Sequence, residues 1–474
     1  MADKNYTKHS FRIAQLCYII IVLIALWMLP GAEVWSTCGA MIAVWLCVSV
    51  IYRYTPWYSN KGRWILLVAS TLLSVGVIAN VHYFTVALGG TTELPVLNNP
   101  DAHRYYYDAL ASVGHPVGVF SPLKQHGYGL LISWLWRITG ITIVSPLVVN
   151  MMAILLCIIV SGGITWQVLR NCGNRTSQST IAMSLTAVVC YYLNSGTLLL
   201  KEAGVCFAMV LVALSFTGIY ATPKTLRNKV LLWIGFGVGC ILLAFMRHTY
   251  LLMIPIGVIL MMRRNRQSVA TGVIMAITGV AIMVVCAQLT EEPSVVGLPQ
   301  GAIQGITVKT SFFYDHAQHR AYNDIVAGYF DFPIWKRLLY LPMSAVVQYL
   351  VPFPWNFARD MGFGYTLAYA HVAYPWYAVG GLVLYYLFVG WRKSPRILIR
   401  MSLCGVVLWL IPAYLFAGTV SRYGLPMLPM LVPSAVYVVA CCRHSRMFRW
   451  WCVGYIVLLV LTLVVAYNLQ QSAM

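Results

Sequence analysis

Acidic side chains are scarce in this chain. Only 12 of its 474 residues are Asp or Glu, and all charged residues together make up 9% of the composition. Soluble domains carry about 25% charged residues, so an ordinary water-soluble fold is excluded. No CxxC pair occurs among the 13 cysteines, most of which lie inside apolar runs. Neither a zinc site nor a disulfide framework is therefore indicated.

Long apolar runs take the place of the missing charge. The chain is 60% hydrophobic with a mean hydropathy of +0.76. Its apolar runs recur from Phe11 to Leu469, and each is long enough to cross a ~30 Å hydrocarbon core as a helix. Only helices and closed barrels satisfy the backbone inside lipid, and these runs lack the alternation of barrel strands. The sequence therefore predicts an all-α polytopic integral membrane protein.

The basic residues set the orientation. Of the 32 Lys and Arg residues, 21 lie in short segments that share one side of the membrane, together with a single acid, Asp3. Cytoplasmic loops retain Lys and Arg, so this side is cytoplasmic and holds the N-terminus, whose first span is uncleaved. The net charge of +20 then indicates contacts with anionic membrane lipids and no nucleic-acid partner.

We expect about 13 transmembrane helices, with the C-terminus on the outer side. They span approximately residues 11–30, 34–52, 64–84, 143–169, 179–198, 202–220, 229–246, 250–262, 268–288, 372–390, 401–417, 423–440 and 450–468. Two more apolar stretches, 127–140 and 338–351, do not fit as crossings, because counting either would place a basic cluster outside. We expect both to be helices in the outer interface, a depth that suits their Trp, Tyr and Arg content.

These elements divide the chain into five parts. They are an N-terminal three-helix membrane segment (1–84), a first outer loop (85–142), central transmembrane helices (143–288), a second outer loop that forms a cap (289–371) and C-terminal transmembrane helices (372–474). Eleven of the twelve acids fall on the outer side, and charge in mid-span is almost absent. Carriers more often place polar residues near the bilayer midplane, so chemistry or binding at the outer face is favoured over transport.

The first outer loop carries NNPDAHRYYYDALA, a polar and aromatic segment at the membrane surface. Asn98–Pro100 is a turn signal, and Asp101 can cap a helix from Ala102 to about Ser112. A capping role alone would explain an Asp here. A partly desolvated Asp101 would also have a raised pKa and serve as a general base toward a lipid-linked substrate. Tyr105 and Asp108 are candidate substrate-binding residues of the same helix.

Isolated cations mark three other outer helix junctions. They are Lys201 beside Glu202, then Arg247, then Arg422 beside Tyr423. Lys binds phosphate as a point charge and Arg binds it bidentately, so Lys201, Arg247 and Arg422 are candidate phosphate ligands. Glu202 and Tyr423 are candidate substrate-binding residues. The alternative for each is interfacial anchoring.

The second outer loop contains His316 and His319, three residues apart, with Asp315 and Asp324 nearby. A His-x-x-His pair without a further ligand is a weak metal signal, so we expect no metal and no other cofactor, and interpret the two histidines as candidate substrate-binding residues. We expect this loop to select the acceptor.

The first outer loop and the span after it resemble the GT-C superfamily, membrane glycosyltransferases that use polyprenyl-phosphate-linked sugars. The resemblance rests on the Asp-Ala-x-x-Tyr sequence at Asp101, on the short apolar helix that follows Gln125-His126-Gly127-Tyr128, and on the span after Gly140. Here the loop follows the third span, whereas in that family it usually follows the first. The resemblance implies that Asp101 is the catalytic residue, and His126 is a further candidate substrate-binding residue.

The implied function is an inverting transfer of a hexosyl or pentosyl group from a polyprenyl-phosphate donor to a glycan, lipid or protein acceptor. It would take place at the periplasmic or extracellular face of a bacterial inner membrane, in polysaccharide biosynthesis for the cell envelope. The cytoplasmic loops are short and basic and hold no P-loop or GxGxxG cradle, so they cannot carry a nucleotide-sugar domain.

Two alternatives stay open from the sequence. An O-antigen or capsule polymerase, or a ligase, would also have many spans and large outer loops, and would use arginines such as Arg320, Arg337 and Arg359 against a lipid diphosphate. A lipid-linked oligosaccharide flippase would need a polar path through the bilayer, and the spans give little sign of one.

Overall fold

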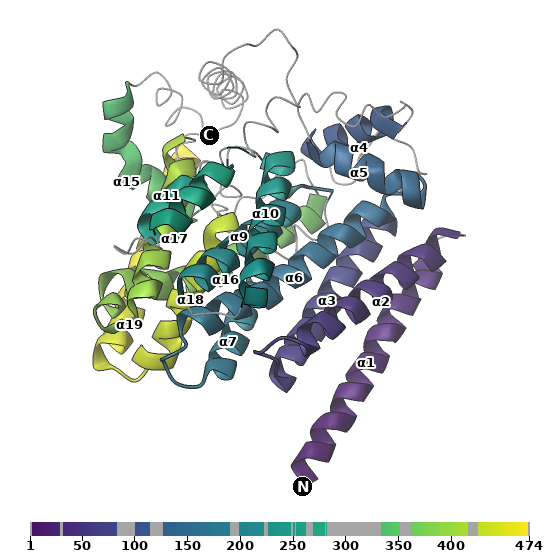
Figure 1. The fold of residues 1–474 in the computed structure, drawn as a ribbon, viewed down its shortest axis with the longest axis horizontal. Helices are drawn as coiled ribbons and strands as arrows, with labels where there is room; N and C mark the ends of the chain where they lie inside the picture. The colour runs from purple at the N-terminus through teal and green to yellow at the C-terminus, as the bar shows by residue number, and fades with distance from the viewer. Residues whose placement is uncertain are drawn as a thin grey trace.

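The computed structural model describes residues 2–28, 32–82, 100–113, 127–189, 199–221, 226–247, 250–251, 253–261, 269–279, 281, 333–350, 362–415 and 425–472. Every regular element within these residues is a helix (Figure 1). The prediction of an all-helical chain is thus confirmed for the part that the structure describes.

The described residues form the following helices, in chain order. They are α1 (Ala2–Met28), α2 (Ala32–Arg53), α3 (Asn60–His82), α4 (Pro100–Val113), α5 (Gly127–Thr139), α6 (Val144–Val168), α7 (Arg175–Val188), α9 (Glu202–Ala221), α10 (Leu226–Arg247), α11 (Met253–Met261), the helix Val269–Gly279, α15 (Ile334–Leu350), α16 (Gly362–Phe388), η4 (Gly390–Lys393), α17 (Arg396–Leu415), η6 (Leu425–Met427), α18 (Leu428–Tyr437), η7 (Val438–Cys442) and α19 (Arg446–Ser472).

Five of the described helices are long and apolar enough to cross a membrane, judged by length and composition. Their spans are Ser36–Arg53, Asn60–His82, Val144–Val168, Glu202–Ile219 and Arg446–Asn468. The last of them, in α19, has none of its apolar span buried inside the protein. Side chains such as Trp450, Leu458 and Leu461 are exposed there, as lipid-facing side chains are. Together these helices are compatible with an α-helical membrane protein.

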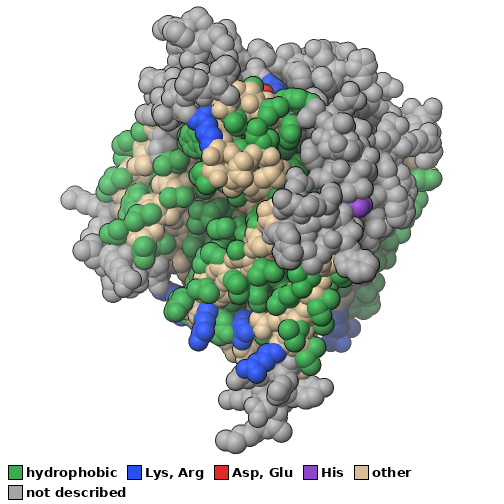
Figure 2. Space-filling model, turned by 90° about the vertical axis from the view of Figure 1, so that its right-hand side faces the viewer, with side chains coloured by type: hydrophobic (Ala, Val, Ile, Leu, Met, Phe, Trp, Pro, Cys, Tyr) green, Lys and Arg blue, Asp and Glu red, His purple; other side chains and the backbone are tan. Residues whose placement is uncertain are grey.

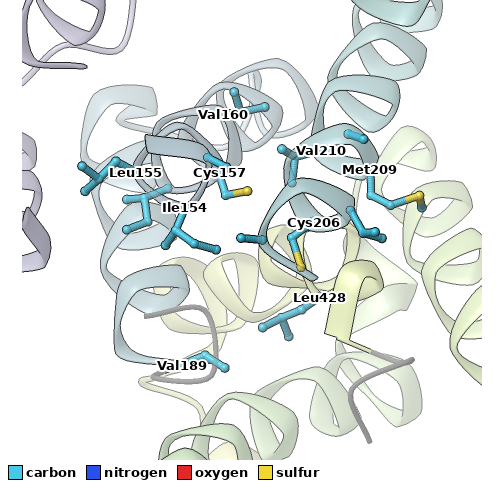
Figure 3. Close-up of a cluster of buried hydrophobic side chains, with 14 of the residues drawn as sticks. Ile154, Leu155, Cys157, Val160, Val189, Cys206, Met209, Val210 and Leu428 are labelled. Atoms are coloured by element: carbon cyan, nitrogen blue, oxygen red, sulfur yellow. The ribbon is translucent and has the colours of Figure 1, made fainter. Parts of the chain in front are cut away.

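Helix α6 lies at the centre of the packing. It contacts α2, α3, α5, α7, α9 and α18, and 78% of its apolar span is buried. Figure 3 shows Ile154 and Cys157 of α6 among buried side chains that include Cys206 of α9 and Leu428 of α18. A close-packed interior has low compressibility. The packing around α6 therefore restrains the positions of its buried side chains.

The two ends of the helix bundle differ. The N-terminus lies at one end and the α4–α5 pair lies at the other (Figure 1). Lys and Arg side chains gather along the lower edge in Figure 2, which is the end of the N-terminus, below a wide hydrophobic surface. Exposed basic residues such as Arg53, Lys61 and Arg170 belong to the clusters that the sequence assigns to the cytoplasmic side.

Helix α15 corresponds to the second apolar stretch, for which the sequence predicts a helix at the outer interface or dipping partway into the membrane. It begins at Ile334, it contains Pro342, and it packs against α17 and α16. Ser344 and Gln348 are buried while Leu339 is exposed, and Gln348 Nε2 donates to the backbone oxygen of Trp409 at 2.8 Å. The helix therefore has an apolar exposed face and packs its polar side chains against the protein, and its depth in the membrane stays a prediction.

Helix α16 begins at Gly362, ten residues before the expected start of its span at about 372. Pro375 lies inside it. A proline in a membrane helix is tolerated because neighbouring groups satisfy the freed backbone groups.

Candidate functional site

Helix α4 is the element that carries Asp101. It runs from Pro100 to Val113, whereas the sequence predicted a start at Ala102 with Asp101 as the cap. Proline is favoured at the first helical position because its fixed φ suits the helix. Asp101 therefore lies within the first turn, where a carboxylate interacts favourably with the helix dipole. The structure places Asp101 by the backbone of this helix.

Helices α4 and α5 form a tightly packed pair. A Cβ on Gly129 would lie 3.0 Å from the Cβ of Asp108 and 3.4 Å from the backbone oxygen of Tyr105, so glycine allows the two backbones to come close. At the other end of the pair, Arg137 Nη2 donates to the backbone oxygen of Ser112 at 2.8 Å. The pair presents Tyr105 toward the rest of the protein with an exposed fraction of only 2%.

Tyr105 connects the helix of Asp101 to the start of α9. Its ring centroid lies 5.1 Å from that of Tyr128 in an edge-to-face arrangement. The Nζ atom of Lys201 lies 5.4 Å from the centroid of the Tyr105 ring, within the range of a cation–π interaction. Two residues that the sequence nominated separately, Tyr105 and Lys201, are thus in one cluster.

Asn150 of α6 joins the same cluster from below. Its Nδ2 atom donates to the Tyr128 hydroxyl oxygen at 2.8 Å and to the backbone oxygen of Leu200 at 3.0 Å. Burial raises the pKa of Tyr128, the negative charge of Glu202 raises it further, and the hydrogen bond from Asn150 opposes both. Tyr128 is therefore a neutral phenol at physiological pH. We refer to Tyr105, Tyr128, Asn150, Lys201 and Glu202 as the outer cluster.

Glu202 is almost fully buried in the outer cluster. It is the first residue of α9 and lies in its first turn, where the helix dipole favours a carboxylate. Its side chain is 2% exposed. A carboxylate buried this deeply beside a lysine at a helix start is costly unless neighbouring groups compensate for it.

The end of α10 lies next to the same place. Helix α10 ends at Arg247, and α9 packs along α10. A Cβ on Gly204, in the first turn of α9, would overlap the side chain of Met246. A Cβ on Gly127, at the start of α5, would overlap the carbonyl group of Phe245. The backbone of Arg247 is thereby placed beside the starts of both α5 and α9.

The remaining nominated residues fall outside the described residues. They are His126, His316, His319, Arg422 and Tyr423. The described chain resumes at Leu425, in η6, and η6 packs against α9. Of the nominated set the structure therefore brings the side chains of Tyr105 and Lys201 together. Glu202 follows Lys201 and lies close enough to Tyr128 to raise its pKa, and Asp101 and Arg247 lie on helices beside them.

The carboxyl group of Asp108, also on α4, has a raised pKa. Burial raises the pKa of its carboxyl group, and the nearby guanidinium of Arg104 opposes this with a smaller effect.

The Asp108→Asn variant tests this shift. The unfolded carboxyl ionises at a lower pH than the folded one, so Asp108 costs stability increasingly as the pH rises through these two pKa values. We expect Asp108→Asn to have a higher thermal midpoint than the native protein at about pH 7, and an equal midpoint at about pH 2.5, where the carboxyl group is protonated in both states. Melting curves of the purified protein at the two pH values measure this, and an equal midpoint at both would contradict it.

Asn150 escaped the sequence analysis, although one signal pointed to it. It is an amide near the N-terminal end of a 25-residue apolar helix whose other amide, Gln167, lies near the opposite end. Polar side chains inside a membrane helix generally mark functional or packing sites. Comparison with known proteins yields no match. No family model, curated protein or solved structure is similar to the chain. The outer cluster must therefore be interpreted from its own geometry.

Metal ligands do not gather in the part of the chain that the structure describes. No group of three or more His, Cys, Asp or Glu there could hold a metal ion. The outer cluster instead combines one cation, one carboxylate, two phenols and an amide. Such a set can bind an anion and hydrogen-bond to hydroxyl groups.

Proposed function

We propose that the protein is a membrane glycosyltransferase that moves a sugar from a polyprenyl-phosphate donor to a hydroxyl-bearing acceptor at the outer face of a bacterial inner membrane. The observation that carries the proposal is the position of Lys201, whose ammonium lies 5.4 Å above the ring of Tyr105. Tyr105 belongs to the helix that bears Asp101. A cation for phosphate and a carboxylate for proton transfer are thus carried by contacting elements.

The proposed reaction is a direct displacement. The Asp101 carboxylate accepts the proton of the acceptor hydroxyl, whose oxygen forms a bond to the anomeric carbon of the donor. The bond from the anomeric carbon to the phosphate oxygen breaks, and the polyprenyl phosphate leaves with the electron pair. One displacement inverts the anomeric configuration. Lys201, together with Arg247 and Arg422, stabilises the charge that develops on the leaving phosphate.

The sugar hydroxyls have candidate partners around the same position. Glu202 and Asp108 accept hydrogen bonds from hydroxyl groups, and Tyr105 offers an aromatic face beside Lys201. His126 and Tyr423 adjoin the described outer elements in sequence. His316 and His319 of the second outer loop are assigned to the acceptor.

A reconstituted assay tests the proposal. The purified protein in liposomes is supplied with a prenyl-phosphate monosaccharide or, separately, with a prenyl-diphosphate oligosaccharide, together with a glycan acceptor. We expect a covalent product and free prenyl phosphate with the first donor. Product with the second donor alone would replace the proposal by a polymerase or ligase. Movement of the second lipid across the bilayer without a covalent product would replace it by a flippase.

The Lys201→Met variant tests the phosphate role. Methionine keeps an unbranched side chain against Tyr105 and removes the charge. A hydrogen bond to a charged group contributes about 1.5–3 kcal/mol, so we expect kcat/KM for the donor to fall by about 10- to 100-fold. Steady-state kinetics measures this. The matched control is Lys393→Met, an exposed lysine of η4, for which we expect native kinetics. Native kinetics for Lys201→Met would remove Lys201 from the site.

A further inference from the structure

Asn150 is held by two hydrogen bonds that join distant parts of the chain. Its side chain is 2% exposed, and one nitrogen, Nδ2, makes both bonds. The acceptors are the Tyr128 hydroxyl, 22 residues away in sequence, and the backbone oxygen of Leu200, 50 residues away. A primary amide nitrogen carries two hydrogens, so both are used. Burying an amide in an apolar helix is costly, and these two bonds offset that cost.

The two acceptors lie on either side of the Lys201–Tyr105 contact. Leu200 directly precedes Lys201 in the chain. Tyr128 contacts the ring of Tyr105 at 5.1 Å between centroids, and that ring faces the Lys201 ammonium. The contacts therefore form a closed circuit that runs from Asn150 through Tyr128, Tyr105 and Lys201, and back to Asn150 through Leu200.

We propose that Asn150 is a positioning residue, which fixes the Lys201 ammonium relative to the helix that carries Asp101. Helix α6 is the most suitable element for this task because it packs against six other helices of the described chain. Asn150 thus holds two groups at one point of α6. They are the Leu200 backbone just before α9 and the Tyr128 ring, which contacts Tyr105 of α4. The catalytic role of Asn150 rests on the proposed function, whereas its effect on the position of Lys201 does not.

Other side chains of similar size cannot replace this amide. A leucine of similar volume makes neither bond. A carboxylate could accept a hydrogen bond from the Tyr128 hydroxyl, but it has no hydrogen to donate to the Leu200 oxygen. Tyr128→Phe removes one of the two acceptors and keeps the ring against Tyr105. These variants separate the link to α5 from the link to Lys201.

Chemical labelling of Lys201 tests the placement without any assay of activity. The purified protein is treated with a water-soluble acetylating ester, and the acetylation rate of each lysine is measured by mass spectrometry, with exposed Lys393 as the internal reference. We expect Asn150→Leu to raise the rate at Lys201 about fivefold, the factor given by one lost hydrogen bond. Tyr128→Phe should raise it less, because the bond to Leu200 remains.

The matched control is Ser161→Ala on the same helix. Ser161 is fully buried, and it accepts a hydrogen bond from Thr186 Oγ1 at 2.9 Å, away from Leu200 and Tyr128. It should lower stability without changing the Lys201 rate. A native Lys201 rate in folded Asn150→Leu, or an equal rise in Ser161→Ala, would overturn the proposal.

Donor kinetics then connect the placement to transfer. If Asn150 acts through Lys201, Asn150→Leu should lower kcat/KM about fivefold in the native background and have no further effect in Lys201→Met. Additive losses would show that Asn150 acts on activity by another route and would overturn the positioning role in catalysis. If the native protein transfers no sugar from any donor, the proposed function fails while the labelling result still decides the placement of Lys201.

Discussion

Asp101→Asn is expected to lower the rate of sugar transfer by about 10²- to 10⁴-fold, the range that general base catalysis supplies. Asparagine has nearly the same shape as aspartate, and it keeps a side-chain oxygen in the first turn of α4, but it cannot accept the acceptor proton. The thermal midpoint and the expression level should therefore stay close to native. Single-turnover assays with saturating donor measure the chemical step directly.

The matched control for Asp101→Asn is Asp3→Asn. Asp3 is the single acid that the sequence places on the opposite side of the membrane, in the first turn of α1. It receives the same change of charge and shape, and it should leave transfer unchanged. Full activity of Asp101→Asn would remove the central catalytic assignment. A loss in Asp3→Asn of the same size would mean that net charge, and not the outer site, governs the assay.

The helices of this protein could be predicted because their causes are local. The length of the apolar run alone predicts α6, since the predicted span 143–169 nearly coincides with Val144–Val168. The turn signal before Asp101 gave α4 to within two residues. The apolar run after His126 gave α5, which ends at Thr139 just before Gly140, whose φ of 81° is the left-handed conformation that glycine adopts at helix ends.

The outer cluster could be predicted only in part, because its contacts join residues far apart in the chain. Isolated charged residues between apolar runs are visible in the sequence, and on this basis Lys201 and Glu202 were predicted to be site residues. Nothing local indicates that the Lys201 ammonium would meet Tyr105, 96 positions earlier by residue number. Asn150 was missed because a single amide carries no spacing pattern. The contact between the polar side of α15 and α17 was likewise not visible, because α17 lies further along the chain.

Gly127→Ala is expected to be the most damaging conservative change at the outer cluster. An added Cβ would lie 2.7 Å from the carbonyl carbon of Phe245 and 3.0 Å from its Cα. These are backbone atoms within α10, so no side-chain rotation relieves the clash. Overpacking of this kind costs about 1–3 kcal/mol, and occasionally more. A lower thermal midpoint measures that cost.

Activity should fall further than stability in Gly127→Ala, because the next residue is Tyr128. Moving α5 away from α10 moves the Tyr128 hydroxyl away from Asn150 and the ring away from Tyr105. A displacement of about 1 Å in a reacting site can cost about 10²-fold in rate. The matched control is Gly237→Ala within α10, where an added Cβ meets no atom within 4 Å. Alanine there should stabilise the helix by up to about 1 kcal/mol and leave transfer native. Equal behaviour of the two variants would mean that α5 tolerates a shift, and that the Tyr128 contacts do not set the geometry of the site.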